Sequence, residues 1–185
     1  SWKLAPQAAA MGVGPGQGDI SWWSNYDADV ITRACFFDDE YVFNADGTFS
    51  NVQGGDTWNE PWQGTDPEAC GAPIAPHDGS NAGTWVYDEA ASTITINGLG
   101  AYLGLAKVLN GGELSVEGTP VPESITYLVS FSEDGSIMTL DIAIADPGWW
   151  RFVLTNAPPT ATSPFEGTWK LAPQAAAMGV GPGQG

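Results

Sequence analysis

Residues 40–49 read Glu40-Tyr41-Val42-Phe43-Asn44-Ala45-Asp46-Gly47-Thr48-Phe49. Apolar residues flank the dipeptide Asp46-Gly47, which is a strong signal for a tight turn between two antiparallel strands. The stretch therefore predicts a β-hairpin, and it favours an antiparallel β fold for the rest of the chain.

Strand-like segments of the same kind recur on both sides of this hairpin. The expected strands are Trp2–Leu4, Gly83–Asp88, Thr93–Asn97, Ser124–Ser132, Ser136–Ala145 and Trp149–Leu154. A turn is expected at 89–92, between the second and third of these strands, and Asp134-Gly135 predicts a further hairpin between the fourth and fifth. Two segments stay open between strand and short helix, namely 30–37 and 99–109. About eight short strands separated by turn signals predict an all-β fold, either an antiparallel barrel or a sandwich.

A long insertion interrupts the strands between Asn51 and Ser80. It is rich in Trp, Gly and Pro, and a loop of that length inside a compact domain is usually functional or held in place. Cys70 lies within it, and Cys35 is the only other cysteine. An even cysteine count in an acidic, Trp- and Thr-rich chain favours a Cys35–Cys70 disulfide formed in an oxidising compartment. Two buried thiols are the alternative.

Charge is sparse and one-sided. The 185 residues hold 22 Asp and Glu against five Lys and Arg, which gives a net charge of −17. Such a surface repels nucleic acid and anionic membranes. No apolar run reaches the roughly 18 residues of a membrane span, so neither nucleic acid nor a membrane-spanning segment is expected.

An exact internal repeat sets the domain organisation. Residues 2–18 return letter for letter as 169–185, and the offset is 167 residues. Seventeen identical residues in a row are not a coincidence, and a fixed period is typical of repeat proteins. We therefore expect a β-domain over 1–155, a Pro- and Thr-rich linker over 156–166, and the start of the next repeat over 167–185.

Three interpretations of this repeat remain open: a window on a tandem array, a second copy that fills a place in a neighbouring molecule, and an artificial duplication. The first two both imply assembly with identical repeats or subunits. The segment is almost uncharged and rich in Ala and Gly, so it can lie along a neighbouring domain without desolvating charge. An ordered N-terminal strap on its own domain is the alternative role of this segment. The residues expected to carry that assembly are Trp2, Leu4, Pro6, Met11 and Val13, with their counterparts Trp169, Leu171, Pro173, Met178 and Val180.

Several short motifs resemble the lipocalin-like β-barrel repeat domains of secreted and surface proteins of marine Bacteroidetes. The motifs are Gly167-Thr168-Trp169, Tyr41-x-Phe43-x-x-Asp46-Gly47-Thr48-Phe49, Gly83-Thr84-Trp85-x-Tyr87-Asp88, Ile125-Thr126-Tyr127 and Trp150-x-Phe152-x-Leu154. A narrower likeness, in Trp22-Trp23-Ser24 and Asp38-Asp39-Glu40-Tyr41, is to accessory domains of secreted polysaccharide-degrading enzymes. The resemblance implies an extracellular or cell-surface β-barrel, and the insertion at 51–80 departs from a minimal barrel of this kind.

Aromatic residues in or beside loops are the best binding signal. The candidates are Trp22, Trp23, Tyr26, Trp58, Trp62, Trp149 and Trp150. Exposed indole faces stack on sugar rings while neighbouring polar groups bind the hydroxyls, and the same residues also form protein–protein contacts. Plugs for the ends of a barrel are the alternative role.

Catalytic and metal-binding patterns are weak. His77 is the only histidine and lies in an expected turn, and the many acids single out no catalytic pair. The glycines of 12–18 lack the helix that a dinucleotide-binding loop needs. Carboxylates at Asp27, Asp29, Asp38 and Asp39 make Ca²⁺ a candidate ligand, although Ile31 and Thr32 break the regular calcium-loop pattern.

Two functional hypotheses follow. The first is a non-enzymatic structural subunit of an extracellular fibre or tandem-repeat adhesin, which requires no cofactor. The alternative is a carbohydrate-binding accessory module of a polysaccharide-degrading system.

Overall fold

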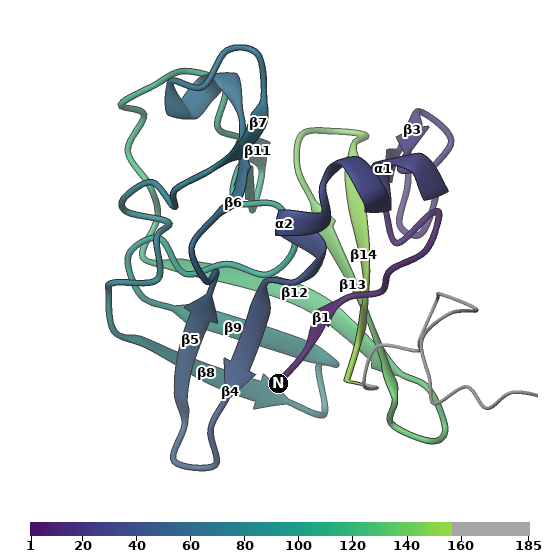
Figure 1. Ribbon diagram of the computed structural model, residues 1–185. Helices are drawn as coiled ribbons and strands as arrows, with labels where there is room; N and C mark the ends of the chain where they lie inside the picture. The colour runs from purple at the N-terminus through teal and green to yellow at the C-terminus, as the bar shows by residue number, and fades with distance from the viewer. Residues whose placement is uncertain (157–185) are drawn as a thin grey trace, which may run out of the picture.

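The computed structural model describes residues 1–156 (Figure 1). These residues contain fourteen strands, two short α-helices and one 3-10 helix. The strands of the main sheet are β1 (Lys3–Leu4), β2 (Met11–Gly14), β3 (Trp23–Ser24), β4 (Glu40–Phe43), β5 (Thr48–Val52), β8 (Gly83–Asp88), β9 (Thr93–Asn97), β12 (Ser124–Phe131), β13 (Ile137–Ala143) and β14 (Trp149–Thr155). Two small sheets contain β6 (Thr57–Asn59) with β7 (Ala69–Gly71), and β10 (Val108–Leu109) with β11 (Gly112–Glu113). The helices are α1 (Asp27–Thr32), α2 (Ala34–Phe37) and η1 (Pro61–Gln63).

The main sheet confirms the all-β prediction. The strand order is β3-β2-β14-β13-β12-β9-β8-β5-β4. Strand β1 lies outside this order and pairs with β14. The pairings in this sheet are antiparallel. Of the two expected architectures, the barrel is not closed in the described part of the chain: no ladder joins β3 to β4, and the N-terminal segment meets β4 only through an isolated bridge. The expected number of about eight strands was also too low. Strands of two or three residues, such as β3 and β6, pair through backbone groups and carry no hydrophobic periodicity that a sequence would reveal.

The hairpins predicted from turn signals are present. β4 and β5 pair around the Asp46-Gly47 turn, where Gly47 has a φ of 86°. β8 pairs with β9, and β12 pairs with β13. Alternation along β12 buries one face of the strand against the core, and its outer face stays partly exposed.

The two undecided segments have different outcomes. Residues 30–37 are mostly helical, because α1 and α2 follow each other with only Arg33 between them. Asp29 accepts a hydrogen bond from the Tyr26 backbone N–H, which caps the first turn of α1. Residues 99–109 form a loop whose last two residues are β10. Four of the five glycines from 98 to 112 have positive φ, which suits turns and disfavours a regular strand or helix.

The N-terminal segment brings the two ends of the sheet together. β1 and β2 both pair with β14, and Trp2 forms an isolated bridge with Tyr41 of β4. In Figure 1, β1 accordingly runs between β4 and β14. Leu4 and Met11 of this segment are fully buried. The segment is therefore an integral part of the core of its own domain.

One core of aliphatic and aromatic side chains lies under the sheet and includes Tyr41, Phe49, Ile96, Tyr127 and Phe152. The loops above it are held by the predicted disulfide, which joins Cys35 of α2 to Cys70 of β7. The small β6–β7 sheet and η1 thus lie over one end of the main sheet (Figure 1). No helix among residues 1–156 is long and apolar enough to cross a membrane.

Candidate functional site

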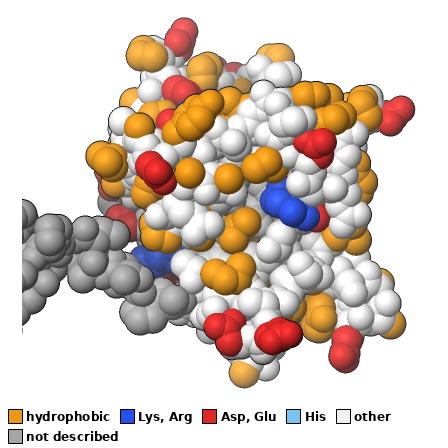
Figure 2. Space-filling model, turned by 90° about the vertical axis from the view of Figure 1, so that its right-hand side faces the viewer, with side chains coloured by type: hydrophobic (Ala, Val, Ile, Leu, Met, Phe, Trp, Pro, Cys, Tyr) orange, Lys and Arg blue, Asp and Glu red, His pale blue; other side chains and the backbone are white. Residues whose placement is uncertain are grey.

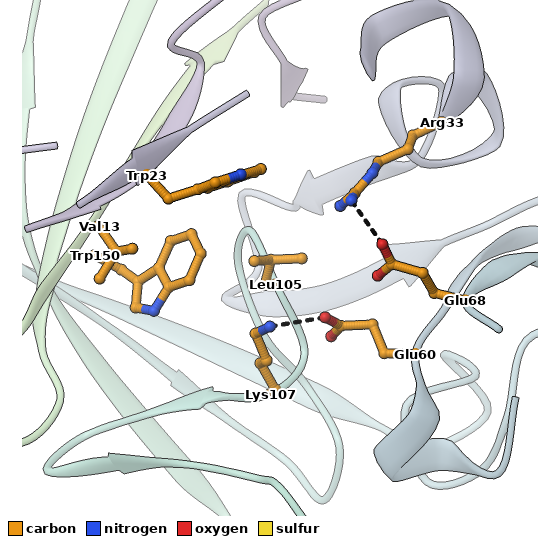
Figure 3. Close-up of a pocket in the computed structure, with 8 residues that line it drawn as sticks. All are labelled: Val13, Trp23, Arg33, Glu60, Glu68, Leu105, Lys107 and Trp150. Carbon is orange, nitrogen blue, oxygen red and sulfur yellow. Dashed lines mark hydrogen bonds and ion pairs between the residues drawn. The ribbon is translucent and has the colours of Figure 1, made fainter. Parts of the chain in front are cut away.

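A pocket of about 250 Å³ opens between the small β6–β7 sheet and the main sheet. Its lining residues are Val13, Trp23, Arg33, Glu60, Glu68, Leu105, Lys107 and Trp150. In Figure 3, the aromatic side chains lie on one side, Arg33 and the two glutamates lie on the other, and Leu105 and Lys107 lie between them. The pocket therefore has an apolar wall facing a charged wall.

Two indole rings make the apolar wall. Trp23 of β3 and Trp150 of β14 lie with their ring centroids 6.0 Å apart and their planes tilted by 60°. Trp150 is fixed from behind by a parallel stack on Phe152, and its indole N–H donates to Glu113 at 2.8 Å. Trp23 is only partly buried. The wall is thus rigid at its base and open to solvent at Trp23.

Arg33 and Glu68 form one half of the charged wall. The Arg33 guanidinium donates to Glu68 Oε1 at 3.0 Å, and the Trp58 indole N–H donates to Glu68 Oε2 at 3.3 Å. The guanidinium also lies over the ring of Trp58, 4.6 Å from its centroid, and 5.9 Å from that of Trp23. Cation–π contacts of this kind orient the guanidinium as well as stabilise it.

The disulfide positions this ion pair. Arg33 precedes Cys35 by two residues, and Glu68 precedes Cys70 by two residues. Because Cys35 and Cys70 are covalently joined, the short chain segments that carry Arg33 and Glu68 are held next to each other. The 51–80 insertion is therefore pinned at the point where it contributes to the pocket.

Glu60 and Lys107 form the other half of the charged wall. Lys107 Nζ lies 2.7 Å from Glu60 Oε1, and the Trp62 indole N–H donates to Glu60 Oε2 at 3.0 Å. Glu60 is only 7% exposed, so its charge needs these partners. Lys107 Nζ also lies 5.7 Å from the centroid of the Trp150 ring, which links the charged wall to the apolar one.

The structure brings four of the seven predicted aromatic residues to this site. Trp23 and Trp150 line the pocket, while Trp58 and Trp62 hold its two glutamates. Trp22 and Tyr26 are 55% and 71% exposed and line none of the described pockets. Trp149 is half-buried and pairs in the sheet with Gly14 and Ala143.

The four predicted calcium ligands have separate roles. Asp27 accepts the Ala8 backbone N–H, Asp29 caps α1, and Asp38 is exposed. Asp39 is buried and accepts the Thr57 hydroxyl at 2.6 Å. Within residues 1–156, the one group of three metal-type ligands is Cys35, Asp56 and Cys70, and its two sulfurs form the disulfide. The Ca²⁺ prediction thus has no assembled cluster in this part of the chain.

Two buried titratable groups lie close to the site. Burial raises the pKa of Asp39 to about 7, against the lowering effect of the Thr57 hydrogen bond. Burial lowers the pKa of His77 to about 4. His77 packs edge-on against Trp62 and Tyr102, with ring centroids 5.3 and 6.0 Å apart. The His77 side chain is therefore a buried packing group.

The predicted assembly residues fall into two sets. Trp2, Leu4, Met11 and Val13 lie in or beside the first two strands, and Pro6 follows β1 in an exposed turn. Their counterparts Trp169, Leu171, Pro173, Met178 and Val180 lie outside the described residues, as does nearly all of the predicted linker. The N-terminal copy acts as a strap on its own domain, which was the alternative to a contact between domains.

Sequence reasoning missed the charged wall. Arg33 and Lys107 are two of only five basic residues in the chain, and this scarcity is a signal that could have singled them out. Glu60 and Glu68 had no such signal among 22 acids. Comparison of the sequence with protein-family models and with curated proteins gave no match.

Proposed function

We propose that this domain is a non-catalytic, extracellular carbohydrate-binding repeat, and that its pocket holds one sugar unit. The observation that carries the proposal is the partly exposed indole face of Trp23 opposite the Arg33–Glu68 and Glu60–Lys107 pairs (Figure 3). The disulfide supports the extracellular assignment, because such bonds persist in oxidising compartments.

The two walls match the two surfaces of a sugar ring. A pyranose has an apolar face of C–H groups, which packs on an indole ring, and an edge of hydroxyls that both donate and accept hydrogen bonds. The charged wall supplies N–H donors from Arg33 and Lys107 and acceptors from the glutamates. Its two ion pairs are preformed, so little side-chain freedom remains to be lost on binding. The volume of about 250 Å³ is at the small end for ligand pockets and suits a single unit better than a chain.

The state of the two glutamates supports binding rather than hydrolysis. Glycosidases use one carboxyl group as a proton donor and a second as base or nucleophile. Both oxygens of Glu60 and both oxygens of Glu68 already accept hydrogen bonds from a cation and an indole N–H. This arrangement holds the carboxylates as fixed acceptors.

The test compares two adjacent tryptophans. A panel of neutral and uronic-acid-containing oligosaccharides is screened, and the tightest binder is titrated by calorimetry. Trp23→Ala should weaken binding at least about tenfold, which corresponds to about 1.4 kcal/mol. Trp22→Ala removes a neighbouring indole outside the pocket and should leave the affinity unchanged.

Three outcomes would contradict the proposal. One is no binding to any oligosaccharide of the panel. Another is an equal loss of affinity in both variants, which would place the sugar elsewhere. The third is hydrolysis of the bound oligosaccharide, which would make the domain an enzyme.

A second candidate function rests on a different observation, the 167-residue period of the sequence. An exact period supports a structural subunit of an extracellular fibre or tandem-repeat adhesin, whose partners are identical repeats. Sugar binding and array formation are compatible, since an adhesin needs both. Electron microscopy of the native material tests this candidate, because free single domains would contradict it.

A further inference from the structure

The N-terminal segment makes contacts along the whole length of β14. Lys3 pairs with Thr155 and Leu4 with Leu154. After a turn, residues 11–14 pair with residues 149–152. Between the two ladders, Ala5 N–H donates to Val153 O, and Val153 N–H donates to Ala10 O. Residues 3–14 therefore occupy one continuous groove beside β14.

This groove selects its occupant by side-chain size. Leu4, Ala5, Ala10 and Met11 are each at most 3% exposed, so their side chains are buried in the core. Glycine is required at position 12, because a Cβ there would lie 2.6 Å from Ile20 Cβ. Few sequences meet both demands.

Residues 169–185 meet these demands at every position, because they repeat residues 2–18 without a change. Leu171 stands for Leu4, Met178 for Met11, and Gly179 for Gly12. The chain thus carries two equivalent occupants and, within residues 1–156, one groove.

The register also puts the second copy within reach. Lys3 is the partner of Thr155, so the chain that leaves β14 at Asn156 emerges beside the start of β1. Twelve residues, 157–168, separate Asn156 from Trp169. A chain that turns back from β14 runs antiparallel to it, which is the direction of β1. Two residues suffice for a turn between antiparallel strands, so twelve are ample.

We propose that residues 169–185 replace residues 2–18 beside β14 of the same chain. Residues 19–185 then form a complete, circularly permuted version of the domain, and the first copy is released. Either copy completes the sheet, so loss of one copy is rescued by the other. This proposal does not depend on sugar binding.

The test uses the full chain with one charge placed in either copy or in both. Leu4→Asp puts a carboxylate at a fully buried position, and Leu171→Asp is the matched change in the second copy. Each single variant should stay folded, with a Tm close to that of the unchanged chain. The double variant should lose its cooperative unfolding transition, because neither copy can then fill the groove.

Hydrogen exchange followed by mass spectrometry shows which copy is in place. The substitution gives the two otherwise identical segments different masses. In the Leu4→Asp chain, slow exchange should move from residues 3–14 to residues 170–181. Size-exclusion chromatography with light scattering should show a monomer.

Three results would overturn the proposal. An unfolded Leu4→Asp chain would show that the second copy does not rescue the sheet. A Leu4→Asp chain that folds only as a dimer or polymer would place the second copy in another molecule. Slow exchange that stays on residues 3–14 would show that the first copy tolerates the charge. The pair Met11→Asp and Met178→Asp repeats the test at β2 and guards against an effect special to position 4.

Discussion

At the scale of single residues, Asp39 and His77 are buried groups whose pKa values move in opposite directions. Asp39 holds its proton up to about pH 7, against about 3.9 in an unfolded chain. The nearby carboxylates of Asp38 and Asp56 raise the pKa of Asp39 further, and Lys3 lowers it. His77 stays neutral down to about pH 4, against about 6.5 when unfolded. Between about pH 4 and 6.5 these two groups have opposing effects on stability.

The signs follow from proton linkage. In that window the folded state binds one more proton than the unfolded state at Asp39, so this group makes stability fall as pH rises. At His77 the unfolded state binds the extra proton, so this group makes stability rise with pH. We expect Asp39→Asn to make the free energy of unfolding rise more steeply with pH than it does in the unchanged chain. His77→Phe, which keeps an aromatic ring, should change this slope in the opposite direction, so that the free energy of unfolding decreases with pH relative to that of the unchanged chain.

Urea unfolding at several pH values between about 4.5 and 6.5 checks this prediction. The relevant quantity is each variant's difference from the unchanged chain, with a slope of up to about 1.4 kcal/mol per pH unit. Parallel curves for all three proteins would contradict the assigned pKa shifts.

At the same scale, the sequence predicted the aromatic half of the site and not the charged half. Trp23 and Trp150 stood out because tryptophan beside loops is a recognisable binding signal. Glu60 and Glu68 gained their roles through partners 47 and 35 residues away, Lys107 and Arg33. Such pairs depend on how the 51–80 insertion folds back, which local patterns do not encode.

At the scale of elements, the disulfide is the link between that insertion and the rest of the domain. It joins α2 to β7 and spans 35 positions of sequence. The segment it closes contains β6 and η1, which are short and bury few apolar side chains. The disulfide thus holds this segment against the domain, as buried hydrophobic faces hold the longer strands elsewhere in the fold.

Replacing both cysteines by serine should lower the free energy of unfolding by about 3–4 kcal/mol, because the unfolded chain gains freedom when the loop is opened. Sugar binding should weaken in the same variant, since Arg33 and Glu68 lose their common anchor. Denaturant unfolding and calorimetric titration measure the two effects, and a reducing agent applied to the unchanged chain should reproduce them. Unchanged stability would show that packing alone holds the insertion.

Local signals predicted local elements well and long-range pairings poorly. The β4–β5 and β12–β13 hairpins follow from Asp-Gly turns between strand-like runs, so neighbouring residues suffice to predict them. The pairing of β1 with β14 joins residues about 150 positions apart, and no turn signal marks it. The exact repeat indicated that the N-terminal segment matters, but its place in its own sheet came only from the structure.

At the scale of the whole molecule, the net charge of −17 is distributed rather than concentrated. Figure 2 shows the acidic side chains of one face as separate groups, mostly toward its edges, with hydrophobic and uncharged polar groups between them. The acids therefore keep molecules apart at long range, while the uncharged areas permit close contact. This combination suits a protein that works at high local concentration, as in an array.

The antiparallel pairing of β1 with β14 has a mechanical consequence. Ser1 and Asn156 leave the sheet side by side, so tension along a string of such domains pulls on the hydrogen-bonded pairs one after another, like a zipper. The N-terminal strap should therefore peel away at low force before the remaining sheet yields. Its seventeen residues would extend the string by roughly 55 Å per domain. Single-molecule pulling on a tandem array should show this small first step, and one all-or-none rupture would contradict it. A string of this kind would lengthen under a sudden load and recover when the load falls.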